Sequence, residues 1–300
     1  MKLTRRDFLK LCGASAAALG LSATDLGRLK EVLANPNGPT VIWLQGTGCT
    51  GCSESFLNFA SYYNPMSAAD VLINSINLVY HPTLMSLAGD SAVAAAEAAY
   101  NNGGYFLAVE GGVPTKFRGN TCLAWTYNDT EVTFQQAVLD LSAQAAGILC
   151  IGTCASWGGV AAAPPNPTAV KSVRAHTGKT TINIPGCPPH PNWMVWAVSQ
   201  LLLGETISLD SYGRPTTLFN RTVHDQCWRR GAEEAETFGQ DRLCLKELGC
   251  LGPDTIANCP LQMWNNYANW CVDANAFCIG CTHPQFPFRQ LTGQGEREND

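Results

Sequence analysis

Short motifs containing cysteine follow three of the apolar runs in this chain, and their placement constrains the fold more than any other feature. Five runs have the composition and length of strands: Thr40–Leu44, Ile76–His81, Tyr105–Glu110, Gly147–Gly152 and Thr181–Gly186. Helix-like segments alternate with them, at Ser53–Tyr62, Ser91–Asn101, Phe134–Ala145, Thr168–His176 and Pro191–Leu203. This alternation predicts a parallel sheet covered by helices on both faces.

The predicted fold is therefore α/β, and it divides into two parts. A flavodoxin-like parallel-sheet domain is expected over residues 35–204, because the alternation of strands and helices ends there. Residues 205–300 are rich in Cys, Trp, Asn, Gly and Pro and have few long apolar runs. Burial alone would stabilise such a small, irregular domain poorly, and metal clusters could supply the missing stability.

Four cysteines are predicted to meet at one edge of the sheet. The motif GTGCTGC follows the first strand, GTCASWGG the fourth and PGCPPHP the fifth. The carboxyl ends of parallel strands share one edge, where ligands bind. We call these cysteines the first set: Cys49, Cys52, Cys154 and Cys187.

Four thiolates suit an iron–sulfur cluster or structural zinc. Glycines at 46, 48 and 51 let backbone N–H groups face the site, which favours the more negatively charged iron–sulfur cluster. Two alternatives are a redox disulfide between Cys49 and Cys52, and cysteines that serve as small core residues.

The second set combines a histidine with three cysteines. Its members, in the motifs TVHDQCW and RLCLKELGC, are His224, Cys227, Cys244 and Cys250. A lone histidine is a weak signal, but three cysteines leave one coordination position open that His224 could fill. An imidazole in place of a thiolate removes one negative charge and raises the potential of a cluster, which suits a point of electron entry or exit.

The third set lies near the C-terminus and consists of Cys259, Cys271, Cys278 and Cys281. The spacing favours ligation by all four cysteines, while a buried free thiol is the alternative for Cys271. Of the remaining cysteines, Cys12 precedes the first strand, Cys150 lies within a predicted strand and is expected in the core, and Cys122 has no obvious partner.

The N-terminus has the features of an export signal. A paired arginine, Arg5 and Arg6, precedes a short apolar run, and small residues end at Ala34. This order predicts a twin-arginine signal peptide over residues 1–34, with an ordinary amphipathic helix as the alternative. Such a signal exports folded proteins with their cofactors inserted, so cysteines in an exported chain need not form disulfides.

Charge and hydropathy exclude two kinds of partner. Without residues 1–34 the chain would have 13 basic and 21 acidic residues, a net charge of −8, which argues against nucleic acid. No later apolar run reaches the length that spans a bilayer, so the mature chain is expected to have no transmembrane segment.

Taken together, GCTGC, GTCASWGG, PGCPPHP, the pair His224 and Cys227, and CIGC after NWC resemble the small subunit of periplasmic nickel–iron hydrogenases. The resemblance runs from the signal to about Pro287. It implies that the first set binds the proximal [4Fe–4S] cluster and the second set the distal [4Fe–4S] cluster. It also implies that Cys259, Cys278 and Cys281 bind the medial cluster.

Two positions depart from the commonest pattern of this family. Cys271 stands where that pattern has proline and a [3Fe–4S] medial cluster, so a fourth thiolate implies [4Fe–4S] here. Gly48 stands where the pattern has glutamate. Both departures resemble the selenium-containing [NiFeSe] subgroup, in which selenocysteine would lie in the other subunit.

The resemblance implies an electron-transfer subunit with no catalytic residue of its own. Its partners would be a large subunit that carries the nickel–iron site and, as acceptor, a multihaem c-type cytochrome docking near His224. The alternatives are an iron–sulfur subunit of a related non-hydrogenase complex and a secreted, disulfide-rich binding protein.

Overall fold

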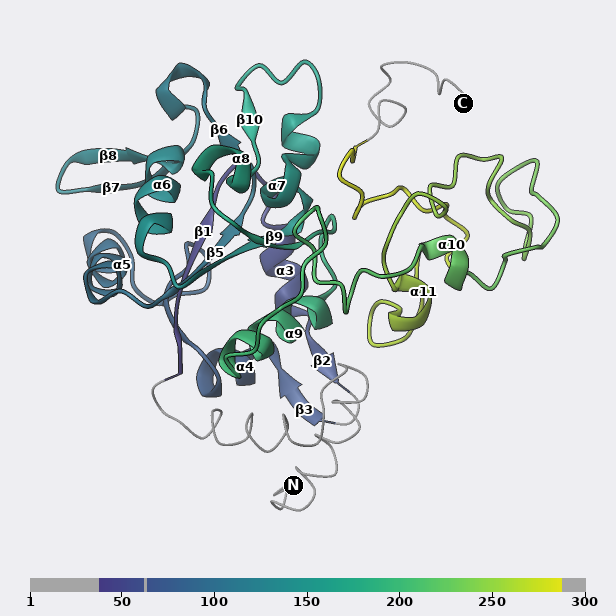
Figure 1. Ribbon diagram of the computed structural model, residues 1–300, viewed down its shortest axis with the longest axis horizontal. Coiled ribbons are helices and arrows are strands. Elements are labelled where there is room, and N and C mark those ends of the chain that lie inside the picture. The colour runs from purple at the N-terminus through teal and green to yellow at the C-terminus, as the bar shows by residue number, and fades with distance from the viewer. Residues whose placement is uncertain (1–37, 62–63, 288–300) are drawn as a thin grey trace.

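A five-stranded parallel sheet organises the larger part of the chain (Figure 1). The computed structural model describes residues 38–61 and 64–287, so the expected signal peptide lies outside the described residues. The strands of the sheet, in the order of the chain, are β1 (Thr40–Gln45), β4 (Asn77–Tyr80), β5 (Phe106–Glu110), β9 (Gly147–Ile151) and β11 (Ile182–Ile184).

The strand order confirms the predicted flavodoxin-like fold. Across the sheet the order is β11-β9-β5-β1-β4, with every pair parallel. Counted along the chain, this is the 2-1-3-4-5 order of doubly wound proteins, whose ligands bind beyond the carboxyl ends of the strands.

The alternation of side chains along β1 separates two cores. Val41 and Trp43 belong to a cluster with the helices α3 (Gly51–Leu57), α4 (Ala68–Asn74) and α9 (Pro191–Leu202). Ile42 and Leu44 belong to a second cluster with α5 (Asp90–Asn102) and α6 (Phe134–Gln144) on the opposite face. Because successive side chains of a strand point to opposite faces, both faces are buried, as expected for a covered parallel sheet.

Two of the expected helices are corrected by the structure. Helix α3 ends at Leu57, well before Tyr62, because Asn58 forms its C-cap. The expected helix over Thr168–His176 is wrong in its first half, where β10 (Val170–Lys171) pairs with β6 (Val113–Pro114). Only α8 (Val173–Thr177) is helical, because the Ser172 hydroxyl caps it by accepting from the Ala175 N–H.

Several short elements were not expected from the sequence. Helix α4 begins with a capping box formed by Ser67 and Asp70. The remaining elements of this part are β2 (Ala60–Ser61), β3 (Asn64–Ser67), β7 (Leu123–Tyr127), β8 (Thr130–Thr133), α7 (Gly152–Trp157), and the 3₁₀ turns η1 (Lys116–Gly119) and η2 (Gly159–Ala162).

The C-terminal part has little regular structure, as its composition predicted. Among the described residues after α9, only α10 (Val223–Gln226) and α11 (Cys259–Gln262) are helical. Some of its buried side chains, such as Phe219, Val272 and Cys278, belong to the same core cluster as α9. None of the helices within residues 38–287 combines the length and apolarity needed to cross a bilayer.

Candidate metal centres

The structure brings the four cysteines of the first set together at the carboxyl edge of the sheet. Cys49 and Cys52 lie between β1 and the first turn of α3, Cys154 lies in α7 directly after β9, and Cys187 follows β11. Cys49, Cys154 and Cys187 all lie close enough to Cys52 to raise its pKa when they are ionised, although up to 138 positions separate these residues in the chain. The parallel strands therefore bring together four cysteines that lie far apart in the sequence.

Glycines surround these thiols so closely that no side chain would fit. A Cβ at Gly152 would lie 2.5 Å from Cys52 Sγ, and one at Gly159 would lie 2.9 Å from Cys154 Sγ. Both glycines have positive φ, at 85° and 53°. Backbone without side chains thus forms a cage around the sulfurs, and such a cage leaves room for a bulky inorganic group.

Burial disfavours free thiolates in this cage. Burial, and then the charge of Glu110 and of the neighbouring cysteines, raises the pKa of Cys52 far above its usual value. Burial and the charges of Cys154 and Cys49 raise the pKa of Cys187 to about 11. Since clustered, buried thiolates repel one another, they need a cation such as iron to hold them in the ionised form.

A buried carboxylate that the sequence analysis missed supports the first set. Glu110, only 2% exposed, ends β5 beside Gln45 of β1. Its Oε1 accepts the N–H of Cys52 at 3.0 Å and that of Ser53 at 3.4 Å. Its Oε2 accepts from Trp43 Nε1 and Gln45 Nε2, both at 3.2 Å, and from the Ser53 hydroxyl.

Glu110 thereby fixes the start of α3, which carries Cys52. The sequence signal that could have revealed it is an acidic residue at the end of an apolar strand, directly before two glycines.

The second set lines one small cavity in the C-terminal part. All four predicted residues, His224, Cys227, Cys244 and Cys250, contribute to its wall. Burial, opposed by a backbone hydrogen bond from Arg229, raises the pKa of Cys227, and the charges of Cys250 and Cys244 raise it further. The three thiols and the imidazole are therefore neighbours: α10 and its C-cap carry His224 and Cys227, and loops further along the chain carry Cys244 and Cys250.

The structure also brings the third set together. Burial raises the pKa of Cys259 well above its usual value, and the charges of Cys281, Cys278 and Cys271 add to the shift. Cys259 and Cys278 are buried, whereas Cys271 is exposed. The charge of Cys250 acts on both Cys271 and Cys278, so the second and third sets lie beside each other.

The donor chemistry of the three sets fits iron–sulfur clusters. All thirteen cysteines within the described ranges are free thiols. No three Cys, His, Asp or Glu side chains of residues 38–61 and 64–287 are placed to hold one single metal ion. A four-iron cluster needs a wider cage, because each of its protein ligands binds a different iron.

The two remaining cysteines of the described part lie outside the three sets. Cys150 is fully buried in β9, which confirms its expected place in the core. Burial raises the pKa of Cys122, and its thiol forms a hydrogen bond with the Thr47 side chain.

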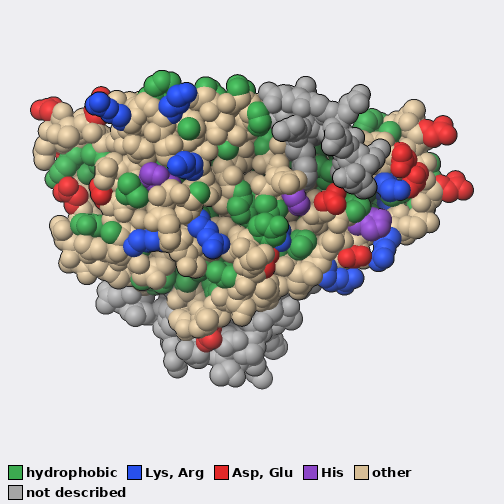
Figure 2. Space-filling model, turned by 45° about the horizontal axis from the view of Figure 1, so that its top comes forward, with side chains coloured by type: hydrophobic (Ala, Val, Ile, Leu, Met, Phe, Trp, Pro, Cys, Tyr) green, Lys and Arg blue, Asp and Glu red, His purple; other side chains and the backbone are tan. Residues whose placement is uncertain are grey.

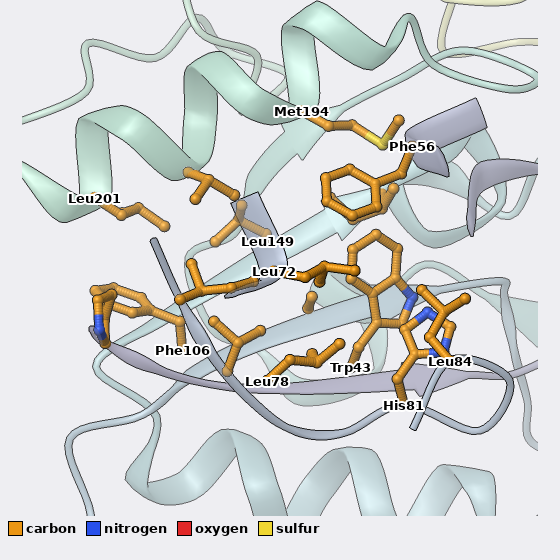
Figure 3. Close-up of a pocket in the computed structure, with 16 residues that line it drawn as sticks. Trp43, Phe56, Leu72, Leu78, His81, Leu84, Phe106, Leu149, Met194 and Leu201 are labelled. Atoms are coloured by element: carbon orange, nitrogen blue, oxygen red, sulfur yellow. The ribbon is translucent and has the colours of Figure 1, made fainter. Parts of the chain in front are cut away.

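An apolar cavity of about 30 Å³ lies on the sheet face below α9, and none of the cysteines lines it (Figure 3). Its wall includes Phe106, Leu149 and Met194, with Trp43 and His81 side by side at one end. The wall consists of core side chains and offers no group of charges to a metal.

The surface near the second set carries charges of both signs (Figure 2). Trp228, next to Cys227, is 52% exposed, and its Nε1 donates to Asp273. Arg230 pairs with Asp225 at 3.3 Å, and Lys246 pairs with Glu234 at 3.0 Å. The second set thus lies near an exposed, mixed-charge face.

Two protein families match the chain, one for each part. Residues 49–201 match the family described as NADH ubiquinone oxidoreductase, 20 Kd subunit. Residues 219–292 match the family described as the C-terminal part of the NiFe/NiFeSe hydrogenase small subunit.

Curated relatives are similar over nearly the whole chain. The periplasmic [NiFeSe] hydrogenase small subunit of Desulfomicrobium baculatum is 40% identical, over 96% of this chain and 97% of the relative. The periplasmic [NiFe] hydrogenase small subunit of Solidesulfovibrio fructosivorans is also 40% identical, over 95% of this chain and 90% of the relative.

Solved structures agree with these relatives. A [NiFeSe]-hydrogenase chain from Dm. baculatum has a TM-score of 0.79 and 39% identity, covering 84% of this chain and 96% of that chain. The corresponding chain from Desulfovibrio vulgaris Hildenborough has a TM-score of 0.78 and 38% identity, covering 85% and 96%.

Proposed function

The chain belongs to the family of NiFe and NiFeSe hydrogenase small subunits, and from this premise we propose how its residues serve hydrogen oxidation and proton reduction. The chain is the electron-transfer subunit of a heterodimeric hydrogenase. Hydrogen is activated at the nickel–iron site of a large-subunit partner, and this chain conducts electrons between that site and an external acceptor. It contributes no catalytic residue of its own.

Three iron–sulfur clusters would occupy the three sets. Cys49, Cys52, Cys154 and Cys187 would hold the proximal [4Fe–4S] cluster; His224, Cys227, Cys244 and Cys250 the distal one; and Cys259, Cys271, Cys278 and Cys281 a medial [4Fe–4S] cluster. When bound, such clusters supply one-electron redox chemistry without making or breaking bonds to the substrate. The assembly of the first set in its glycine cage is the observation that carries the proposal.

The chain's own residues position the ligands and exclude water. Glu110 binds the N–H of Cys52 and so holds the first turn of α3 in place. The burial of Cys259 and Cys278 keeps water from these two members of the third set. Such outer contacts fix the ligand orientation and tune the potential of a cluster.

The fourth cysteine of the third set, Cys271, distinguishes this chain from the commonest pattern of the family. Cys271 lies close enough to Cys259 and Cys281 to raise the pKa of both thiols when it is ionised, and an ionised Cys250 does the same to Cys271, so this member of the third set lies near the second set as well. With Gly48, it leads us to place the chain in the [NiFeSe] subgroup. We expect selenium, where present, in the partner subunit.

We further propose three segments and an export route. Residues 1–34 form a twin-arginine signal peptide, residues 35–204 the flavodoxin-like domain, and residues 205–300 the cluster domain. The chain would reach the periplasm already folded, since this route transports folded proteins. A multihaem c-type cytochrome would dock beside His224, where Trp228 is exposed.

Metal analysis of the purified heterodimer tests this function. We expect about four irons and four acid-labile sulfides for each cluster, with eleven cysteines protected from thiol reagents until iron is removed. A colourless, iron-free protein with paired disulfides would instead support a secreted binding protein. A cluster-loaded chain whose partner lacks nickel would support a non-hydrogenase complex.

A further inference from the structure

The first and third sets lie side by side where the loop carrying Cys187 meets the loop carrying Cys281. The backbone N–H of Cys187 donates a hydrogen bond to the Cys281 sulfur. The two loops come from different parts of the chain, so something must keep them in contact.

Thr153 joins both loops. It lies in α7 beside Cys154 and is 1% exposed. Its hydroxyl donates to the Cys281 carbonyl and accepts the Gly186 N–H at 2.9 Å. Its own N–H donates to the Gly186 carbonyl at 2.9 Å. One hydroxyl thus links α7, the loop after β11 and the C-terminal part of the chain.

Few other contacts could replace this link. On the Cys281 loop, the neighbouring Thr282 donates its hydroxyl to the Ile256 carbonyl at 3.0 Å, which ties it to its own part of the chain. Arg214 Nη1 approaches the Thr282 carbonyl only at 3.5 Å. Both Thr282 contacts stay within residues 205–300, whereas the Thr153 hydroxyl connects the Cys281 loop to the sheet domain.

We propose that Thr153 is a positioning residue whose hydroxyl, bonded to the Cys281 carbonyl and to the Gly186 N–H, holds the loop carrying Cys187 against the loop carrying Cys281. This inference rests on the proposed function, in which both cysteines are cluster ligands. The Sγ–Cβ, Cβ–Cα and Cα–N bonds of Cys187, followed by one hydrogen bond, then connect a ligand of the proximal cluster to a ligand of the medial cluster.

With clusters bound, one electron at a time would pass from the cluster held by Cys187 to the cluster held by Cys281, so that the first would be oxidised by one electron and the second reduced by one. Neither a proton nor a covalent bond changes place, and hydrogen oxidation at the partner's site supplies the electrons. A hydrogen bond from an N–H group to a ligand sulfur also raises the reduction potential of the cluster that this sulfur binds.

The test compares Thr153→Val, Thr153→Ser and Thr181→Val in the cluster-loaded heterodimer. Valine keeps the shape of threonine but lacks the hydroxyl, whereas serine keeps the hydroxyl. Thr181 is the matched control, because it is also 1% exposed, directly precedes β11 and donates its hydroxyl to the Asn183 side chain. Potentials are measured by redox titration with electron paramagnetic resonance, and reduction of the medial cluster by freeze-quench after mixing with hydrogen.

We expect Thr153→Val to lower the medial potential and to slow medial reduction roughly tenfold, as is common when a contact behind a metal ligand is lost. Thr153→Ser and Thr181→Val should match the wild type. A Thr153→Val protein that cannot retain the medial cluster, beside a normal serine variant, would also support the role of the hydroxyl.

Two results would overturn the inference. The first is a Thr153→Val protein with wild-type medial potential and rate. The second is a serine variant as impaired as the valine variant. Absence of iron and sulfide from the wild-type protein would instead refute the proposed function, so the two failures are distinguishable.

Discussion

Replacing Glu110 with glutamine should destabilise the sheet edge that carries the first set, because the groups that face this carboxylate are all hydrogen-bond donors. Its Oε1 faces the N–H groups of Cys52 and Ser53, and its Oε2 faces Trp43 Nε1 and Gln45 Nε2. A glutamine amide has one acceptor oxygen and one NH₂ donor. In either orientation of the amide, its NH₂ group would therefore face two N–H donors of the protein, and those two donors would lose their acceptor.

The size of the effect follows from these two unsatisfied donors. Each buried donor left without an acceptor costs about 1–3 kcal/mol, so the substitution should cost about 2–6 kcal/mol of unfolding free energy. For a domain of this size, about 2–4 °C in melting temperature corresponds to each kcal/mol, which gives a decrease of roughly 5–20 °C.

Differential scanning calorimetry of the heterodimer, at one scan rate for all variants, measures this decrease. Glu54→Gln is the matched control, because Glu54 is exposed and lies in α3, the helix whose first turn Glu110 contacts. Exposed substitutions of this kind change stability by only about 0.5 kcal/mol or less. If Glu110→Gln melted as the control does, the hydrogen-bonding role assigned to Glu110 would be wrong.

Three further predictions concern the other sets and the buried histidines. Cys271→Pro should convert the medial cluster to a three-iron form with a new paramagnetic signal in the oxidised protein, and an unchanged spectrum would mean that Cys271 is not a ligand. His224→Cys adds a thiolate and should lower the potential of the distal cluster in a redox titration, and a raised potential would contradict ligation by His224. Burial lowers the pKa of His81 and of His190 to about 4. Between about pH 4 and pH 6.5 the unfolded chain therefore binds more protons, so the denaturation midpoint should fall as pH decreases through this range and stay level above it.

The strands could be predicted because their signal is local. Runs such as Gly147–Gly152 are apolar, and the observed β9, Gly147–Ile151, differs by one residue. The helix predicted over Thr168–His176 is wrong in its first half, because Val170 and Lys171 pair with β6. That strand partner lies more than fifty residues away, so the local sequence does not reveal the pairing. Helix α4 was missed even though Ser67 and Asp70 form a readable capping box.

The sequence by itself determined the alternation of strands and helices, the three sets of cysteines and the imidazole of His224, because these are matters of residue type and spacing. Only the tertiary structure decided which polar groups support the sets. Glu110 reaches Cys52 across 58 positions, and Thr153 reaches Cys281 across 128. Such contacts depend on where whole strands and loops come to lie, and no local pattern of side chains specifies that in advance.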